Sequence, residues 1–156
     1  MHTTAVVIAH AIDTLFVPEE IDLSMAWVCV CDGAYSAVRD AGIRVDALLG
    51  DFDSIDPPLL ERVKATNELE LLHRPCQMAT DLEKALGEVH QRQIDCVDII
   101  NAVGGRCDQT LYNLRLLRRY KARFSTCRVW TEHEVVRVLC DERIDLYGSP
   151  GSRVSV

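Results

Sequence analysis

The stretch AWVCVCDGAYSAVRDAGIRVDALLGDFDSID, residues 26–56, decides the fold class. It begins with an apolar run at 26–31 that stops at an Asp-Gly pair. It continues through a helix-like segment at 34–41 and reaches a second apolar run at 46–49. Short apolar runs bounded by glycine and aspartate are typical of strands that are buried on both faces, as in parallel sheets. A strand, a helix and a strand in this order predict a parallel α/β unit.

The alternation of strand-like and helix-like segments extends on both sides of this stretch. We expect further strands at residues 4–9, 69–72, 95–103 and 126–131. We expect further helices at residues 59–66, 80–91 and 108–120. This alternation predicts an α/β fold, with a mostly parallel Rossmann-like sheet flanked by helices. Strands expected at 134–140, 143–147 and 152–156 predict a short strand-rich C-terminal end, either an edge hairpin or the start of a second β-rich unit.

Composition limits the classes of function. The length of 156 residues suggests one domain, and 48% apolar residues suffice for a core. The net charge of −7 disfavours nucleic acid and anionic membranes as partners, and the cations at 115–128 are interpreted as a solvated helix face. A nucleotide bound through a metal ion stays open. We see no targeting segment and no apolar run near the ~20 residues of a membrane span, and we therefore expect a cytoplasmic protein.

Cysteine and histidine spacing argues against a zinc or redox site. The chain has seven cysteines but no CxxC pair, so neither a zinc ribbon nor a thioredoxin-like motif is supported. Its five histidines show no metal-ligand spacing. Several cysteines lie in apolar runs, and we expect them to be small buried side chains in a reducing compartment.

Aspartates gather where the predicted strands end. Four segments carry at least one of them, namely residues 32–34, 50–54, 77–81 and 104–109. In an open α/β sheet, ligands bind outside the carboxyl ends of the strands. Carboxylates placed together repel one another, and a divalent cation among them relieves that repulsion. Magnesium prefers oxygen ligands of this kind, and Asp51 and Asp53 are the best candidate pair.

The sequence Gly104-Gly105-Arg106, between a strand and a helix, is a candidate anion site. Glycines permit close backbone approach, a helix N-terminus favours anions, and a guanidinium matches phosphate oxygens. The alternative is a flexible turn with a solvated arginine. A capping role is likewise an alternative for Asp81, which opens a helix together with Thr80. Neither a P-loop nor a GxGxxG motif occurs in the sequence.

Four segments also carry a family resemblance. They are CDGAYSAV at 31–38, VDALLGDFDSID at 45–56, QMATDLEKAL at 77–86 and GGRCDQTLYNL at 104–114. Their order and spacing resemble those of the thiamin pyrophosphokinases (thiamin diphosphokinases), in the N-terminal catalytic domain of that family. The resemblance spans nearly the whole chain.

This resemblance implies an activity and a domain organisation. The activity is Mg²⁺-dependent transfer of a pyrophosphoryl group from ATP to the hydroxyethyl group of thiamin, which gives thiamin diphosphate and AMP. Residues 1–147 would form the α/β nucleotide-binding catalytic domain. Residues 148–156 are similar to the linker into the family's C-terminal β-domain, and we expect that domain to be absent from this chain. The family also implies a homodimer, weakened without the β-domain.

The matching motifs imply roles for individual residues. The implied catalytic set is Asp51, Asp53, Asp81, Arg106 and Asp108. Of these, Asp51, Asp53 and Asp81 would hold Mg²⁺ on the ATP phosphates, and which aspartate is the base stays open. Arg106 would neutralise phosphate charge, and Asp108 would lie near the thiamin hydroxyl or a second metal. Further residues implied to contact nucleotide or substrate are Asp32, Gly33, Ser54, Gln77, Thr80, Lys84, Gly104, Gly105 and Gln109.

Three other functions compete with this interpretation. One is a pyrophosphokinase that acts on another alcohol, such as a pterin. A second is a nucleotide-binding module without catalysis. The third is a haloacid-dehalogenase-like phosphatase, because residues 51–55 mimic its DxDx[TV] loop. Ile55 replaces the Thr or Val of that loop, however, and the loop does not follow the first strand.

Overall fold

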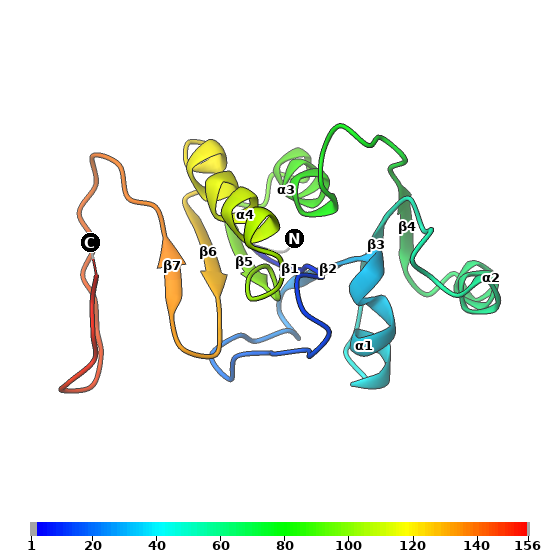
Figure 1. The fold of residues 1–156 in the computed structure, drawn as a ribbon, viewed down its shortest axis with the longest axis horizontal. Coiled ribbons are helices and arrows are strands. Elements are labelled where there is room, and N and C mark those ends of the chain that lie inside the picture. Colours follow the sequence, from blue (N-terminus) through cyan, green and yellow to red (C-terminus); the bar gives the residue numbers. More distant parts are fainter. Residues whose placement is uncertain (1–2, 156) are drawn as a thin grey trace.

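A seven-stranded sheet forms the centre of the molecule, which is described for residues 3–155 by a computed structural model (Figure 1). Its strands are β1 (Thr4–Ile8), β2 (Trp27–Cys31), β3 (Ala47–Gly50), β4 (Glu70–His73), β5 (Cys96–Ile100), β6 (Thr126–Trp130) and β7 (Val135–Arg137). Their order in the sheet is β4-β3-β2-β1-β5-β6-β7. Strands β1 to β6 pair in parallel, and β7 runs antiparallel to β6. The prediction of a mostly parallel α/β sheet is confirmed.

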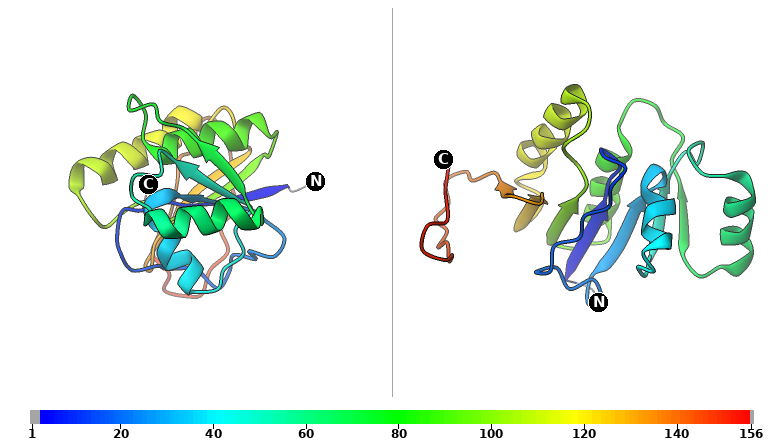
Figure 2. Two further views of the ribbon diagram at one scale, coloured as in Figure 1. Left: turned by 90° about the vertical axis from the view of Figure 1, so that its right-hand side faces the viewer. Right: turned by 60° about the horizontal axis from the view of Figure 1, so that its bottom comes forward.

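Helices cover both faces of this sheet. They are α1 (Tyr35–Asp40), α2 (Pro57–Thr66), α3 (Asp81–Gln91) and α4 (Cys107–Tyr120), preceded by the short 3-10 helix η1 (Asp32–Ala34). Helices α3 and α4 pack on one face and α1 and α2 on the other (Figure 2). The chain therefore changes faces between α2 and α3, and the strand order reverses beside β1.

The strands are continuous apolar runs because both of their faces are buried. All five residues of β2 are buried, and successive side chains point to opposite faces. Val7 and Cys29 join the cluster under α3 and α4, whereas Val6 and Val28 join the cluster on the opposite face. A one-residue change of register would exchange these two sets, so the apolar pattern fixes the pairing.

The C-terminal part of the chain differs from the prediction. The antiparallel β6–β7 pair confirms an edge hairpin, but β7 ends at Arg137. The strand expected at 143–147 is wrong, and residues 152–155 of the strand expected at 152–156 are not a strand either. This segment leaves the sheet beyond β7 (red in Figure 1), and Tyr147 is 95% exposed. An alternating pattern forms a strand only where a partner strand or an apolar surface receives it.

Three cysteines follow the prediction of buried side chains. Cys29, Cys31 and Cys127 are buried, Cys96 is half-buried, and Cys76, Cys107 and Cys140 are exposed. Burial raises the pKa of the Cys127 thiol to about 12. The ends of the predicted domain ranges, residues 1–2 and 156, lie outside the described residues. Across 3–155, the helices are all too short or too polar to cross a lipid bilayer.

Candidate functional site

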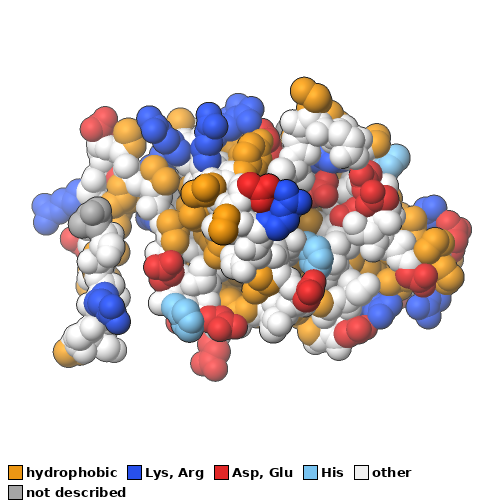
Figure 3. All heavy atoms as spheres, in the orientation of Figure 1, with side chains coloured by type: hydrophobic (Ala, Val, Ile, Leu, Met, Phe, Trp, Pro, Cys, Tyr) orange, Lys and Arg blue, Asp and Glu red, His pale blue; other side chains and the backbone are white. Residues whose placement is uncertain are grey.

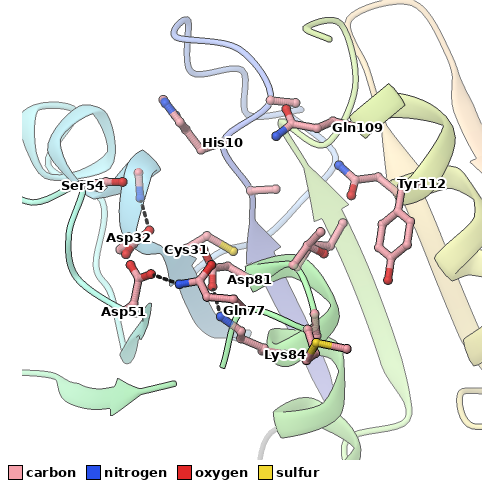
Figure 4. Close-up of a pocket in the computed structure, with 18 residues that line it drawn as sticks. His10, Cys31, Asp32, Asp51, Ser54, Gln77, Asp81, Lys84, Gln109 and Tyr112 are labelled. Atoms are coloured by element: carbon pink, nitrogen blue, oxygen red, sulfur yellow. Dashed lines mark hydrogen bonds and ion pairs between the residues drawn. The ribbon is translucent and has the colours of Figure 1, made fainter. Parts of the chain in front are cut away.

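A pocket of about 530 Å³ lies at the carboxyl edge of the parallel strands (Figure 4). The chain leaves each parallel strand at this edge, so the loops after β1, β2, β3 and β4 meet the N-terminal ends of α3 and α4 there. Nine of the residues predicted for the site line this pocket: Asp32, Gly33, Asp51, Ser54, Gln77, Thr80, Asp81, Lys84 and Gln109. These nine residues therefore lie together at the carboxyl ends of the strands.

Three carboxylates converge at one side of the pocket. Each of Asp32, Asp51 and Asp53 offers an oxygen within 4.8 Å of the others. Asp32 follows β2, whereas Asp51 and Asp53 follow the neighbouring strand β3, so the parallel pairing of the two strands brings them together. In the space-filling view, acidic side chains gather beside the loop that links β4 to α3 (Figure 3).

Asp32 is the buried member of this cluster. Its carboxylate accepts hydrogen bonds from the backbone N–H of Gly33 at 2.7 Å and of Phe52 at 2.8 Å. Burial raises the pKa of Asp32, and the charges of Asp81 and Asp51 act in the same direction, against the two N–H donors. A Cβ at Gly50 would overlap the Asp32 side chain, so a glycine at this position allows the carboxylate its place.

A tight turn at Phe52 presents Asp51 and Asp53. Phe52 has a φ of 68°, which is unusual for an aromatic residue, and its ring stacks on His73 at 5.4 Å. Such conformations persist only where the surroundings stabilise them, and they cluster at functional sites. The backbone N–H of Asp53 and the side chain of Gln77 donate to Asp51 at 3.3 and 2.7 Å, and these bonds hold the pKa of Asp51 below its usual range.

Asp81 and Lys84 form an ion pair at the floor of the pocket. The Nζ atom of Lys84 donates to Asp81 at 2.8 Å, and the Lys84 side chain is only 10% exposed. Their spacing of three residues places both on one side of α3. Asp81 stands in the first helical turn, where the helix dipole favours an acid, and Thr80 caps the helix by accepting from the backbone N–H of Glu83. Asp81 thus lines the pocket outside the group of three converging carboxylates.

Five predicted residues lie off the pocket wall, namely Asp53, Gly104, Gly105, Arg106 and Asp108. Of these, Asp53 still belongs to the carboxylate cluster. Arg106 and Asp108 form an exposed ion pair with each other at 2.5 Å, and the Arg106 guanidinium lowers the pKa of Asp108. A Cβ at Gly105 would overlap the carbonyl oxygen of Ala11, so the close backbone approach predicted for this glycine is made to the chain's own loop.

The pocket residues that the sequence did not predict include three with polar side chains. His10, Tyr112 and Asn113 line the same cavity. His10 follows β1 at the carboxyl edge, and its ring packs on Gly33, where a Cβ would lie 2.7 Å from the imidazole. Tyr112 follows Gln109 by about one turn of α4. Position at the strand edge and helical spacing are the signals that point to these residues.

The fold and the pocket together define the class of protein. An open, mostly parallel α/β sheet that gathers carboxylates and a lysine at its carboxyl edge is an α/β protein with a polar ligand pocket at that edge. Within this class, residues 19–131 match the family model described as thiamin pyrophosphokinase, catalytic domain. The chain belongs to this family.

Known relatives agree with this assignment. Over 91 residues the chain is 33% identical to the thiamine pyrophosphokinase of Bacillus subtilis (strain 168). This aligned stretch covers 58% of this chain and 42% of the relative. The crystal structure of thiamine pyrophosphokinase from Bacillus subtilis matches with a TM-score of 0.67 and 26% identity, over 86% of this chain and 63% of that one. Yeast thiamin pyrophosphokinase, at 13% identity, shares the fold, with a TM-score of 0.70 over 86% of this chain and 60% of its own.

Proposed function

We propose that the chain transfers a pyrophosphoryl group from ATP to the hydroxyethyl group of thiamin, giving thiamin diphosphate and AMP in a Mg²⁺-dependent reaction. The observation that carries this proposal is the convergence of Asp32, Asp51 and Asp53 beside Lys84, in a chain whose family is named for this chemistry. The chain spans 42% of the curated relative's length.

The carboxylate cluster fits a magnesium ion. Its donors are hard oxygens within 4.8 Å of one another, and magnesium binds through one or two carboxylates together with water and substrate phosphates. We propose Asp51 and Asp53 as ligands, as the sequence predicted, with Asp32 as a further ligand. Asp81, the third predicted ligand, pairs with Lys84, and we propose that it lies at the rim of the metal site. When bound, the ion would neutralise the phosphate charge.

The chain's own residues would bind and orient the substrates. Lys84 would attract the phosphates, because its largely buried ammonium faces the pocket next to Asp81. Gln77 would keep the Asp51 carboxylate in place through their hydrogen bond. Arg106 and Asp108 would contact substrate once their mutual ion pair opens. Phosphoryl transfer depends mainly on such positioning and on electrostatic stabilisation, so these contacts would supply most of the catalysis.

The remaining predictions belong to the same proposal. We propose that residues 1–147 are an ATP-binding catalytic domain of Rossmann-like type and that 148–156 are a linker. We also propose that the working form is a cytoplasmic homodimer. The exposed segment beyond β7 supports the boundary between domain and linker, because residues 145–155 lie on the surface and contribute little to the core.

Product analysis of the aspartate variants tests this function. The purified chain is incubated with ATP, thiamin and Mg²⁺, and AMP and thiamin diphosphate are quantified. Asp51→Ala and Asp53→Ala should each lower turnover at least about 100-fold, because charge stabilisation at the phosphates is lost. Asp145→Ala, which removes an exposed carboxylate on the C-terminal segment, is the matched control and should keep full activity.

The same assay separates the competing functions. Turnover with a pterin alcohol but not with thiamin would favour the other pyrophosphokinase. ATP binding without AMP formation, whichever alcohol is offered, would favour a nucleotide-binding module. An acid-labile aspartyl phosphate at Asp51 would favour the phosphatase. Unchanged turnover in Asp51→Ala would contradict the role proposed for the cluster.

A further inference from the structure

A buried glutamate links the two helices that wall the pocket. Glu83 of α3 is 8% exposed, and its carboxylate accepts hydrogen bonds from the hydroxyl of Tyr112 and from the guanidinium of Arg119, both on α4. Burying a charged carboxylate costs free energy unless the group is paired and hydrogen-bonded. Tyr112 and Arg119 together offset this cost for Glu83. The result is a fixed contact between α3 and α4 at the pocket.

The Glu83 side chain makes this contact with α4 and not a local one within α3. Thr80 is the N-cap of α3 and Glu83 is the third helical residue, which is the spacing of a capping box. Thr80 makes its half of the box by accepting from the Glu83 backbone N–H at 3.3 Å. In a capping box the glutamate side chain returns to the N-cap backbone, whereas the Glu83 carboxylate binds side chains of α4.

The hydrogen bond to Glu83 orients Tyr112, which lines the pocket (Figure 4). The hydroxyl of Tyr112, like that of any tyrosine, is protonated at neutral pH and can donate, and its hydrogen bond to Glu83 raises its pKa further. Its anchored hydroxyl fixes the direction of the ring. The ring stands across the pocket from Asp32 and Asp51 and gives this side of the cavity an aromatic surface.

We infer that Tyr112 is a specificity-determining residue that packs against a flat heteroaromatic ring of the ligand, and that Glu83 is the positioning residue that orients it. This inference rests on the proposed function, in which adenine and the rings of thiamin are the two sources of such a ring. Met78, which is 91% exposed and lines the same pocket, offers a second apolar contact. Aromatic rings prefer offset-stacked or edge-to-face partners, and methionine sulfur adds a polarisable contact.

Binding measurements with and without a ring test this inference. Dissociation constants of Mg²⁺-ATP, thiamin and Mg²⁺-tripolyphosphate are measured by calorimetry for the wild-type chain, Tyr112→Ala and Tyr112→Phe. Tyr112→Ala should weaken one ring-bearing ligand about 3- to 10-fold and leave tripolyphosphate unchanged. The ligand that is weakened identifies the source of the ring. Tyr112→Phe keeps the ring but loses its anchor, and it should give a smaller loss for the same ligand.

The control is a second tyrosine that joins the same two helices. Tyr120 of α4 is buried and donates to the backbone oxygen of Glu83 at 3.3 Å, but it does not line the pocket. Tyr120→Phe should therefore leave all three dissociation constants unchanged. Circular dichroism of each variant shows whether it is folded, and Tyr112→Phe keeps the test decisive where Tyr112→Ala does not fold.

The positioning role of Glu83 has its own readout. Glu83→Ala should weaken the same ligand as Tyr112→Phe, and Glu83→Gln, which retains an acceptor for the hydroxyl, should restore much of the loss. In the Tyr112→Ala background the Glu83 substitutions should have no further effect on that ligand, because the ring they orient is gone. A further loss of equal size in that background would contradict the positioning role.

The outcomes distinguish this inference from the proposed function. Equal weakening of ATP, thiamin and tripolyphosphate in Tyr112→Ala, or no weakening of any ligand, would overturn the inference. A wild-type chain that binds neither ATP nor thiamin would overturn it as well. Binding with the predicted ring dependence but without AMP formation would contradict the proposed function alone.

Discussion

The pKa values of two neighbouring carboxylates at the pocket are shifted in opposite directions. Asp32 is buried, and the loss of hydration raises its pKa, whereas hydrogen bonds from Asp53 and Gln77 lower the pKa of half-buried Asp51. Because the folded-state pKa of Asp32 lies above its unfolded value, its ionisation costs stability as pH rises through that pKa. A cation in the cluster would reverse this cost, because it favours the charged form.

Carboxyl-carbon NMR titration measures this difference directly. Asp32 should titrate above the ordinary aspartate value of about 3.9 and Asp51 below it. Mg²⁺ should lower the apparent pKa of Asp32, and by the same linkage Mg²⁺ affinity should fall as pH falls through that pKa. Identical titrations of Asp32 with and without saturating Mg²⁺ would show that the ion binds elsewhere.

At the scale of residues, the sequence indicates which aspartates lie near the strand ends but not which groups they contact. Asp51, Asp53 and Asp81 were found because each follows a strand or opens a helix. That Asp32 joins Asp51 and Asp53, while Asp81 pairs with Lys84, depends on how adjacent loops fold against one another. Local patterns carry no information about such distances. Helical spacing places Tyr112 about one turn from Gln109, but the direction of its ring depends on Glu83 of another helix and could not be predicted.

Among the elements, the long loop between β1 and β2 is placed by contacts from far along the chain. Buried Asn101, which follows β5, accepts from the backbone N–H of Phe16 at 3.1 Å and donates to the carbonyl of Thr14 at 2.9 Å. Gly105 packs against the backbone of Ala11 in the same loop. The strands and helices were predictable from periodicity, but this loop has no period, and its position could not be predicted from sequence.

A pair of glycine substitutions tests that packing. Gly105→Ala places a methyl group against the Ala11 carbonyl and should lower the free energy of unfolding by about 1–3 kcal/mol. Gly87→Ala is the matched control, because Gly87 lies inside α3 with its nearest neighbour, the Tyr120 hydroxyl, at 3.9 Å. That change should raise stability by about 0.5–1 kcal/mol, since alanine favours helix. Equal effects in urea unfolding would contradict the close packing at Gly105.

For the whole molecule, a mostly parallel sheet flanked by helices was predictable, whereas the order of the strands was not. Continuous apolar strands alternating with amphipathic helices predict a parallel α/β sheet whatever the details of the loops. The extent of the C-terminal strands was not predictable, because the alternating pattern beyond Arg137 specifies a strand only if a partner lies beside it. In this chain that segment extends past the edge of the sheet (Figure 1).

Truncation after Glu142 tests whether the segment contributes to the fold. Glu142 keeps its ion pairs with Lys121 at 2.7 Å and Arg137 at 3.1 Å, whereas most of the residues removed are exposed. The free energy of unfolding should change by no more than about 0.5 kcal/mol, as for other surface changes. A loss of about 2 kcal/mol or more would place the segment within the folded domain.

The most direct measurement is the balance of products formed by the full 156-residue chain from ATP and thiamin. The pocket built around Asp32, Asp51 and Asp53 predicts AMP and thiamin diphosphate in equal amounts, with Mg²⁺ present, and neither product once the metal is chelated. ADP or free phosphate in place of AMP, or equal turnover after chelation, would contradict the proposed function.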